Sequence, residues 1–324
     1  MLCPTCQTEA RKFGRDRDGN QRYQCQTCRK TFSDRPVRAL GDMRLNMDKA
    51  LTVLHHLVEG VSIRATMRLT GVNRNTIIDL LMLMGERCER LLSGRIKNLP
   101  VVDVQADEIW GFVAMKERTR ANKAPDQDGI GDAYCFIGIE RQTKLVLAYH
   151  LGRRSSEDAY HFAGKLAEAT TGHFQITTDG FKPYKTAIPS AMSGADFAQL
   201  VKTYATKDDH RYSPGEVNGT IKTPVNGNPD PDRITTSHVE RQNLTVRMGN
   251  RRMTRLTNAF SKKWANHEAM LALGFAYYNF CRPHQTLTEA NDKIKTTPAM
   301  AAKLEDHVWT LAELVEKSAA STQC

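Results

Sequence analysis

Hydrophobic residues recur at helical spacing across residues 44–94. Within 47–58, the apolar side chains that fall on one side predict an amphipathic helix closed by Gly60, namely Leu51, Leu54 and Val58. A short helix capped by Ser62 follows, then a turn at Thr70-Gly71-Val72, and Asn73 caps a longer helix. This order is typical of a helix-turn-helix, whose second helix lies in the major groove of DNA.

The longer helix has an apolar side and a polar start. Its apolar positions, which recur at helical spacing, are Ile77, Leu80, Leu81 and Met84. With that side in the core, the residues at its N-terminal end are expected to face DNA: Arg74, Asn75 and Thr76. An ordinary helical hairpin that contains Gly71 is the alternative interpretation. Residues 94–100 are interpreted as the linker to the next domain.

From Val101 the period of the pattern changes from helical to alternating. Val102, Val104 and Ala106 alternate with polar residues, which predicts a strand with two unlike faces. Residues 134–140, 145–150 and 174–178 predict further strands, and a helix is expected from Ser155 or Ser156 to residue 169. Three antiparallel strands, a helix and a strand with an acid at its end describe a ribonuclease-H-like order. Counting strands does not by itself establish that fold. The fold class expected is α/β, a mixed sheet flanked by helices.

Residues 213–232 are dense in proline and glycine, which predicts an irregular excursion within an insertion near 195–235. A helical pattern resumes at Ser237, a plausible cap, and a polar stripe shares one face of that helix: Glu240, Asn243, Leu244 and Arg247. A solvated helix face is the alternative interpretation of this stripe. A later helix over 261–278 is expected to turn an apolar stripe to the core, formed by Trp264, Leu271, Phe275 and Tyr278.

Four of the eight cysteines form two Cys-x-x-Cys pairs, Cys3 with Cys6 and Cys25 with Cys28. Two such pairs complete a tetrahedral Zn²⁺ site, and four protein ligands leave no open position, so the zinc is expected to be structural. Tyr23 and Phe32 can form a small core for a zinc ribbon over residues 1–36. Disulfides are the alternative, and the absence of a secretory signal argues against them.

Charge is distributed unevenly along the 324 residues, whose formal net charge is +10. Residues 1–100 hold 18 Lys/Arg against 10 Asp/Glu, and residues 241–303 hold 11 against 3. Residues 101–240 reverse the balance, with 16 basic against 19 acidic side chains. Basic segments favour a polyanionic partner, and an acidic middle suits a metal-dependent nuclease. No apolar run is long enough to span a membrane, and the chain is expected to be cytoplasmic.

Three acidic blocks resemble those of insertion sequence 1 family transposases. They are Asp107-Glu108-Ile109-Trp110, then 178–184 (Thr-Asp-Gly-Phe-Lys-Pro-Tyr) and then 239–245 (Val-Glu-Arg-Gln-Asn-Leu-Thr). The segments 251–263 and 278–287 also resemble the family's region after the catalytic blocks, so the resemblance covers nearly the whole chain. Sixty residues separate the second and third acids, whereas shorter members have a much smaller interval.

The resemblance implies a DNA transposase that cuts and joins DNA with an Asp-Asp-Glu (DDE) triad. Carried over by position, the triad is Asp107, Asp179 and Glu240, which would hold two Mg²⁺ (or Mn²⁺) ions. The partners implied are double-stranded DNA, at the element ends and the target, and further copies of the chain in a homodimer or higher multimer. The domains expected are a zinc ribbon (1–36), a helix-turn-helix (44–94), a ribonuclease-H-like catalytic domain (100–303) and a C-terminal tail (304–324).

Other acids compete for the triad positions. Asp103 shares the strand phase of Asp107, and Glu108 is expected on the opposite face of that strand. Asp196, Asp208, Asp209 and Glu216 lie between the second and third blocks, and none has the Arg-Gln-Asn-Leu context that follows Glu240. Together with the start of the longer helix, the cations and amide expected to contact DNA are Asn243, Arg247, Arg251, Arg252, Arg255, Lys262 and Lys263.

Two other functions fit the same motifs. A DNA-binding regulator with a decayed nuclease domain needs only the ribbon and the helix-turn-helix. A structure-specific nuclease of the same fold needs cleavage but no strand joining. Metal-dependent nicking separates the first alternative from a transposase, and strand transfer separates the second.

Overall fold

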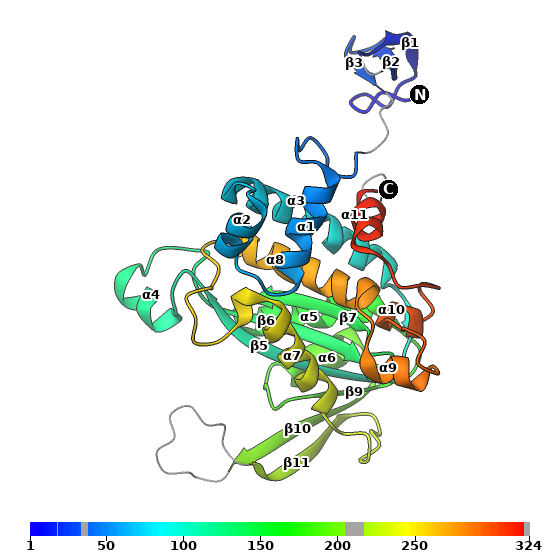
Figure 1. Cartoon of the computed structure of the whole chain (residues 1–324). Helices are drawn as coiled ribbons and strands as arrows, with labels where there is room; N and C mark the ends of the chain where they lie inside the picture. Colours follow the sequence, from blue (N-terminus) through cyan, green and yellow to red (C-terminus); the bar gives the residue numbers. More distant parts are fainter. Residues whose placement is uncertain (18, 34–37, 205–216, 321–324) are drawn as a thin grey trace. The chain divides into compact units, whose positions relative to one another are not determined.

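The structure is a computed structural model that describes residues 1–17, 19–33, 38–204 and 217–320 (Figure 1). The chain divides into two compact units, residues 1–44 and residues 45–324. Each is described by itself below. Among the described residues, none of the helices has both the length and the apolar character needed to cross a membrane.

The N-terminal unit is a three-stranded antiparallel sheet. Its strands are β1 (Ala10–Arg15), β2 (Gln21–Cys25) and β3 (Thr31–Ser33), with β2 in the middle. Tyr23 and Phe32, paired across β2 and β3, stack with ring centroids 5.9 Å apart. The two aromatic residues therefore form the small core expected from the sequence.

Three helices open the second unit where the periodicity places them: α1 (Met47–Val58), α2 (Ile63–Thr70) and α3 (Arg74–Arg95). Ser62 caps α2 by accepting a hydrogen bond from the Ala65 N–H, and Asn73 caps α3 by accepting one from the Asn75 N–H. Gly71 ends α2 with φ of +70°, a conformation that favours glycine. The apolar stripe that starts at Ile77 is buried, which leaves Arg74 and Asn75 exposed.

The helices α1, α2 and α3 belong to the same compact unit as the sheet, and residues 94–100 do not separate two compact units. The second half of α3 packs against α8 (Trp264–Ala276), and the two helices approach so closely that a Cβ atom on Gly85 would lie 2.4 Å from the Ala269 Cα. The short strand β4 (Leu99–Pro100) pairs with β8 (Thr170–Thr171). Near the C-terminus, α11 (Leu311–Ala320) buries Leu314 and packs on α3.

A six-stranded mixed sheet forms the centre of this unit. In chain order the strands are β5 (Asp103–Val113), β6 (Gly131–Glu140), β7 (Val146–Gly152), β9 (Gln175–Thr178), β10 (Asp196–Tyr204) and β11 (Val217–Asn226). Their order across the sheet is β11-β10-β9-β5-β6-β7. The β9 strand is parallel to both of its neighbours, β5 and β10, and the other pairs are antiparallel.

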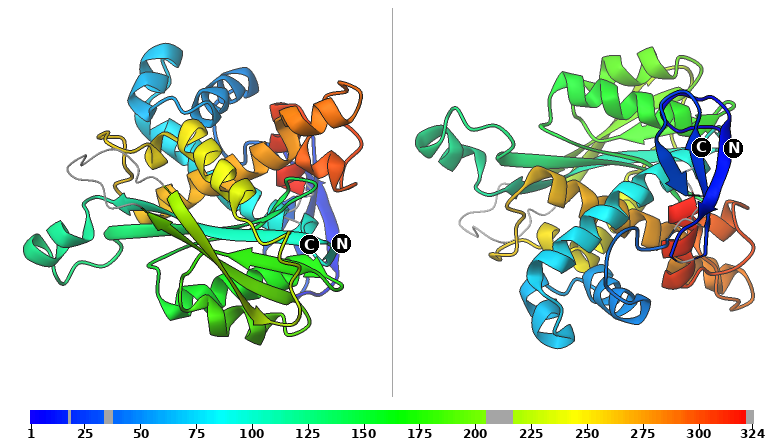
Figure 2. Two further views of the ribbon diagram at one scale, coloured as in Figure 1. Left: turned by 90° about the horizontal axis from the view of Figure 1, so that it is seen from below. Right: turned by 90° about the horizontal axis from the view of Figure 1, so that it is seen from above.

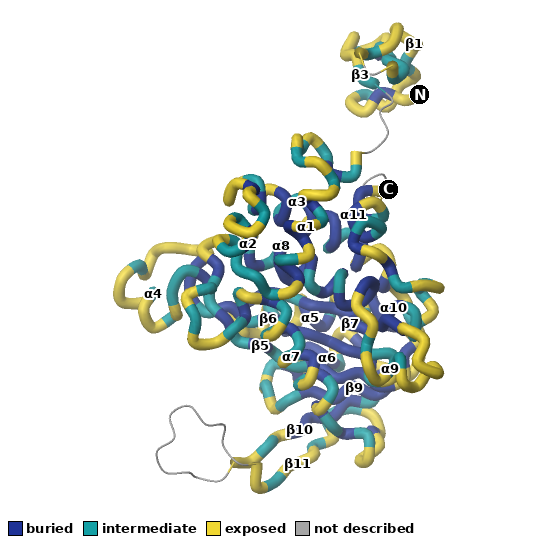
Figure 3. The backbone as a smooth tube through the Cα atoms, viewed as in Figure 1, coloured by how far each residue is buried: buried dark blue, intermediate teal, exposed yellow. Residues whose placement is uncertain are grey.

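Helices cover both faces of the sheet (Figure 2). On one face lie α5 (Ser156–Ala169) and α6 (Tyr184–Ala191); on the other lie α7 (Ser237–Gly249), α8 and the helices α1 to α3. The remaining elements are α4 (Glu117–Lys123), the 3₁₀ turn η1 (Arg251–Met253), the π-helical turn η2 (Tyr277–Cys281), α9 (Gln285–Ala290) and α10 (Pro298–Ala301). The sheet interior is buried, whereas α4 and the outer part of β10 and β11 are exposed (Figure 3).

The predicted strand β5 is buried on both of its unlike faces. Asp103 and Gln105 on the polar face are buried, as are Val104 and Ala106 on the apolar face. A central strand between two helical layers has no solvent face, so its polar residues must find partners inside the protein. Asp103 pairs with Arg141 at 3.0 Å and with Arg233 at 3.2 Å.

Two further predictions differ from the structure. The Pro/Gly-rich segment is not wholly irregular, because residues 217–226 form β11; Pro224 is tolerated there since β11 is an edge strand with only β10 as a neighbour. Trp264 does not face the core with Leu271, Phe275 and Tyr278. It is partly exposed at the start of α8, with the Arg153 guanidinium 4.7 Å from its ring centroid.

Candidate active site and metal-binding groups

The acidic site lies where β9 stops beside β5. Thr178, the last residue of β9, pairs with Ala106 of β5. Asp107 follows Ala106 directly, and Asp179 follows Thr178. Both acids therefore lie at the same point of the sheet although 72 positions separate them in sequence. The sequence prediction that brings Asp107 and Asp179 together agrees with this arrangement.

Three carboxylates meet at this point: one oxygen from each of Asp107, Glu108 and Asp179 lies within 4.8 Å of the other two. Glu108 is expected on the opposite face of β5 from Asp107, and the two do contact different layers, since Asp107 bonds to α7 and Glu108 pairs with Arg154, which precedes α5. Because β9 ends opposite Ala106, both side chains can nevertheless reach Asp179 past the end of that strand.

Glu240 is outside this group of three. It lies on α7 and its Oε1 accepts hydrogen bonds from the Lys202 ammonium on β10 and from the Thr236 hydroxyl, the latter at 2.6 Å. Its negative charge still acts on Asp107 and contributes to the raised pKa of that carboxyl. The structure thus places Glu240 beside the predicted site, held by a cation rather than by the other two acids.

A buried glutamine positions α7 over the site. The Gln105 Oε1 on β5 accepts the N–H of His238 at 2.9 Å and of Val239 at 3.2 Å, so it caps the helix start. Ser237, the cap expected from the sequence, is instead the first helical residue. One and a half turns further along, the Asn243 Nδ2 donates to the Asp107 Oδ2 at 2.7 Å.

The turn after β9 holds Asp179 in one orientation. Its Oδ1 accepts the Phe181 N–H at 3.0 Å, and the Gln199 side chain on β10 donates to the carbonyls of Asp179 and Phe181 at 2.9 and 3.0 Å. The turn also packs closely on β10, because a Cβ atom at position 180 would lie 2.9 Å from the Val201 Cγ2. The Thr-Asp-Gly-Phe block is therefore a fixed turn at a strand end.

One cation is built into the acidic group. The Arg154 Nε donates to the Glu108 Oε2 at 3.1 Å, and its Nη2 lies 3.6 Å from the Asp179 Oδ2. The guanidinium lies 4.6 Å from the Phe181 ring centroid and 5.7 Å from that of Tyr134, which restricts its position. Its backbone has φ of +67°. The sequence gives no signal for this role, since Arg154 lies 25 residues before Asp179 in no motif.

Burial and mutual repulsion make the site unfavourable for negative charge. Burial, together with the charge of Asp179, raises the pKa of Asp107 to about 7 and the pKa of Glu108 to about 7. Burial also raises the pKa of Asp179, against the opposing effects of the Phe181 N–H and Arg154. Clustered acids that share a desolvated site are typical of functional positions.

These residues fit a hard divalent cation. Carboxylate oxygens are the ligands that Mg²⁺ and Mn²⁺ prefer. The Glu108 Oε1, the Asn243 Oδ1 and the Tyr184 hydroxyl, which lies against Glu108, are buried without a hydrogen bond of normal geometry. A cation would offset the burial and the mutual repulsion that raise the pKa values, and it could satisfy the buried carboxylate oxygen.

The other described acids of the sheet are engaged elsewhere. Glu140 accepts the Thr143 N–H and hydroxyl in the turn between β6 and β7, and Asp103 holds Arg141 and Arg233. Asp196, at the start of β10, pairs with His173 at 2.9 Å. Asp208, Asp209 and Glu216 lie outside the described residues.

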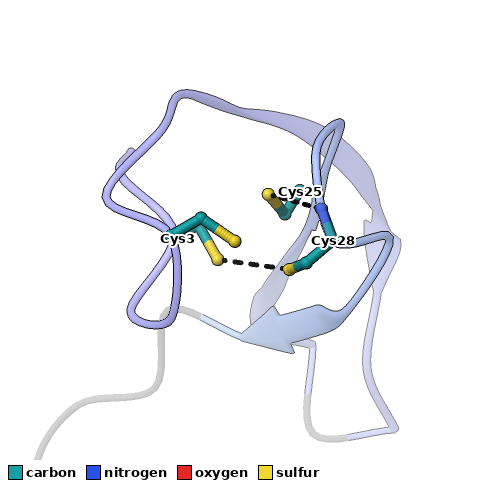
Figure 4. A group of neighbouring side chains, drawn as sticks. Cys3, Cys25 and Cys28 are labelled. Atoms are coloured by element: carbon teal, nitrogen blue, oxygen red, sulfur yellow. Dashed lines mark hydrogen bonds between the residues drawn. The ribbon is translucent and has the colours of Figure 1, made fainter.

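A second metal-binding group is formed by the four N-terminal cysteines, whose Sγ atoms lie within 4.8 Å of one another (Figure 4). The two Cys-x-x-Cys segments have the same backbone conformation and hydrogen bonding. The N–H of residue 7 bonds to the carbonyl of Cys3 as that of residue 29 bonds to Cys25, and both residues have φ of +56°. The Cys3 and Cys28 Sγ atoms are 3.7 Å apart, close to the spacing of about 3.8 Å that tetrahedral Zn–S bonds require.

The thiols of the cysteine group differ in acidity. The Cys28 N–H and the Thr8 hydroxyl lie 3.5 and 3.3 Å from the Cys25 Sγ and lower the pKa of Cys25 to about 6, whereas the neighbouring Cys28 thiol raises the pKa of Cys6 to about 12. The seven described cysteines are all free thiols, so the structure contains none of the disulfides considered as the alternative.

Several predicted DNA-contacting residues line one groove in the second unit. Its walls are the start of α2, the start of α3 and the segment 251–263, and its cations are Arg64, Arg74, Arg251, Arg252, Lys262 and Lys263. Within the described ranges, none of the six forms an ion pair with a carboxylate. Asn75 lines an adjoining groove with Arg64 and Arg74, while Thr76 is partly buried and Arg255 is exposed.

Two of the predicted DNA contacts have structural partners. Arg247 donates to the carbonyls of Met253 at 2.8 Å and Trp110 at 3.1 Å, and burial lowers its pKa to about 10. Asn243 bonds to Asp107 as described above. Both side chains therefore connect α7 to the acidic strand β5.

No protein-family model matches this chain, and no curated protein matches it. Function is therefore argued from the motifs and from the geometry of the site.

Proposed function

We propose that this protein is a DNA transposase of the DDE type, which cuts and joins DNA at the ends of a mobile element. The observation that carries the proposal is the meeting of Asp107 and Asp179 at adjacent strand ends, with the helix that bears Glu240 anchored to the same strand by Gln105. Each of the three lies in one of the sequence blocks that resemble insertion sequence 1 family transposases.

The sheet supports a ribonuclease-H-like catalytic domain. Three consecutive antiparallel strands, β5, β6 and β7, are followed by α5 and then by β9 and β10, which lie parallel on the other side of β5. An acid on the central strand and an acid after the adjacent parallel strand are what such a nuclease needs. The edge strand β11 is an addition to this arrangement.

The basic groove supports double-stranded DNA as the partner. Unpaired Lys and Arg side chains displace counterions from a phosphate backbone and so gain affinity. Arg74 lies at the N-terminal end of α3, the helix that a helix-turn-helix places in the major groove. In the proposed complex, Arg74 on one side of the groove contacts base edges. Cations on the other side, among them Lys262 and Lys263, contact phosphates.

The N-terminal unit is proposed to be a zinc ribbon. Two equivalent cysteine turns, four converging sulfur atoms and a three-stranded sheet support a closed structural Zn²⁺ site. A unit of this size has little core beyond Tyr23 and Phe32, so its fold would depend on the metal.

The proposed reaction consists of two phosphoryl transfers. In the first, the oxygen of water loses a proton and forms a bond to phosphorus, the bond from phosphorus to the 3′ oxygen breaks, and that oxygen takes up a proton to become a free 3′-hydroxyl. In the second, this hydroxyl attacks a phosphate of the target and releases another 3′-hydroxyl, so the number of phosphodiester bonds is conserved. A divalent metal pair supplies charge neutralisation and activation of the attacking oxygen. Asp107, Asp179 and Glu240 are proposed to hold it, and Asn243 to orient Asp107.

Joining two element ends to one target requires two active sites, so the proposal includes a homodimer or a higher multimer of the chain. Each copy would then bind one end through its groove.

The test is strand transfer with labelled DNA from the ends of the element that carries this gene, with Mg²⁺ or Mn²⁺. The wild type is expected to give joined products, and Asp179→Asn is expected to bind the DNA without cutting it. Specific binding without any metal-dependent nicking would favour a regulator with a decayed nuclease domain. Nicking without joining would favour a structure-specific nuclease.

A further inference from the structure

The acidic site contains one carboxylate that the DDE motif does not account for. Glu108 is next to Asp107 in sequence, and its oxygen lies within 4.8 Å of oxygens of both Asp107 and Asp179. Glu240, which the motif names as the third acid, is outside this group and pairs with Lys202. The structure therefore offers two acids for the third ligand position.

Glu108 is deeply buried and only half satisfied. Its side chain is 2% exposed, against 42% for that of Glu240. Arg154 donates only to the Oε2 of Glu108. The Tyr184 hydroxyl lies against the same carboxyl, yet this hydroxyl and the Glu108 Oε1 are both buried without a hydrogen bond of normal geometry. A carboxylate oxygen that is removed from water and lacks a normal hydrogen bond is costly, so its retention needs a reason beyond the fold.

An ion pair with Arg154 does not supply that reason. Arg154 is shared between two acids, since it also lies 3.6 Å from Asp179, and a single guanidinium cannot balance three clustered carboxylates. The side chain of Arg154 is 39% exposed, so it approaches the group from its solvent side. A divalent cation held by one oxygen from each acid would supply the missing partner for Glu108.

We infer that Glu108 is a metal ligand: with Asp107 and Asp179 it completes a three-carboxylate site for Mg²⁺ or Mn²⁺ in the protein without DNA. Glu240 is held apart by Lys202 and Thr236 and contributes little to metal affinity in that state. The inference rests on the acidic site of the proposed function and adds a residue to it.

The test is Mn²⁺ binding by the full, zinc-loaded chain without DNA, measured from the electron paramagnetic resonance signal of free Mn²⁺. Glu108→Gln is expected to weaken Mn²⁺ binding at least tenfold, as is Asp179→Asn, and Glu240→Gln less than twofold. The matched control is Glu157→Gln, which removes one charge from an exposed position on α5 and should leave binding unchanged. Thermal unfolding of each variant shows whether it is folded.

The reverse pattern, strong weakening by Glu240→Gln and none by Glu108→Gln, would overturn the inference. Equal Mn²⁺ affinity for the wild type and Glu108→Gln would also overturn it, provided that both are folded. Failure of the proposed function gives a different result. A wild type that binds Mn²⁺ through Glu108 but neither nicks nor joins element-end DNA would retain this metal site and lose the transposase assignment.

Discussion

Asn243 donates a 2.7 Å hydrogen bond to Asp107 across 136 positions of sequence. The bond joins the helix α7 to the central strand β5 at the acidic site, and it holds one oxygen of Asp107 while the Glu108 N–H holds the other at 2.8 Å. Asn243 is therefore a positioning residue for the first acid of the proposed triad.

We expect Asn243→Ala to lower the rate of metal-dependent DNA cleavage by about 10- to 100-fold, the usual effect of removing a group that orients a ligand. Binding to the same DNA should change little. This result would distinguish a residue that orients Asp107 from a residue that contacts DNA. The control is Leu244→Ala, the exposed neighbour on α7, which should cleave at the wild-type rate. Equal cleavage rates for the wild type and Asn243→Ala would show that Asn243 does not position Asp107 for cleavage.

The raised pKa of Asp107 predicts a pH-dependent cost to stability. An unfolded aspartate has a pKa of about 3.9, whereas burial and Asp179 raise the pKa of Asp107 in the folded protein to about 7. The neutral Asp107 carboxyl is better tolerated in the folded protein than the ionised one. Its contribution to the free energy of unfolding is therefore fully present below about pH 4 and is lost as the pH rises through 7.

Replacing this carboxyl with an amide should remove the free-energy cost of ionising Asp107 in the folded protein. Asp107→Asn is expected to raise the free energy of unfolding by about 2 kcal/mol at pH 8 without added divalent metal, with a smaller gain at pH 5. Thermal or denaturant unfolding at both pH values measures this, with Glu157→Gln as an exposed control. A gain of the same size at both pH values would show that Asp107 does not titrate between them.

The sequence predicts six helices of the second unit, α1, α2, α3, α5, α7 and α8, because local signals decide them, whereas α4, α6, α9, α10 and α11 are not predicted. The Ser155 cap of α5 forms a capping box with Asp158, and the stripe from Ala159 to Leu166 is buried. For β5, the alternation of polar and apolar residues indicates two unlike faces. It does not indicate that a second helical layer, contributed by segments far away in sequence, buries the polar face.

The acidic site was predictable in part for the same reason. The blocks around Asp107 and Asp179 identify two acids that the structure brings together. Glu108 is the weaker candidate by sequence because strand residues alternate between faces, and the two side chains do contact different layers. The early end of β9 removes one neighbour and lets both carboxylates meet Asp179. Gln105, Lys202 and Arg154 act through tertiary contacts, and no sequence motif marks them.

The cysteine group predicts one zinc ion per chain. Cys25→Ser should lose the bound zinc and unfold the N-terminal unit, because few other contacts hold the three strands together. Elemental analysis of the purified chain measures the metal. Cys88→Ala, a buried cysteine of α3 outside the group, should retain it. Zinc retained by folded Cys25→Ser protein would mean that Cys25 is not a ligand.

Arg74 at the start of α3 predicts sequence-specific contact. If it reaches a base edge, Arg74→Ala should weaken binding to element-end DNA by about 1–3 kcal/mol and binding to a random duplex by less. Fluorescence anisotropy with both duplexes at one salt concentration compares the two effects. Equal weakening on both duplexes would assign Arg74 to the phosphate backbone.

The last prediction concerns the opposite wall of the same groove. Lys262 and Lys263 are exposed beside Arg251 and Arg252, directly before α8. Because α8 packs tightly on α3 through Ala269 and Gly85, this wall and the helix-turn-helix are expected to bind one DNA backbone as a unit. Removing one cation that binds a phosphate should reduce the slope of log affinity against log salt by about 0.9.

Lys262→Gln combined with Lys263→Gln should therefore flatten this slope by nearly two for a random duplex, with little effect on the preference for element ends. The matched control replaces Lys293 and Lys295, two exposed lysines outside the groove, with glutamine and should keep the wild-type slope. The control is needed because any loss of positive charge weakens long-range attraction to DNA. A slope that falls equally in both double variants would mean that only the net charge matters, and it would place the DNA outside this groove.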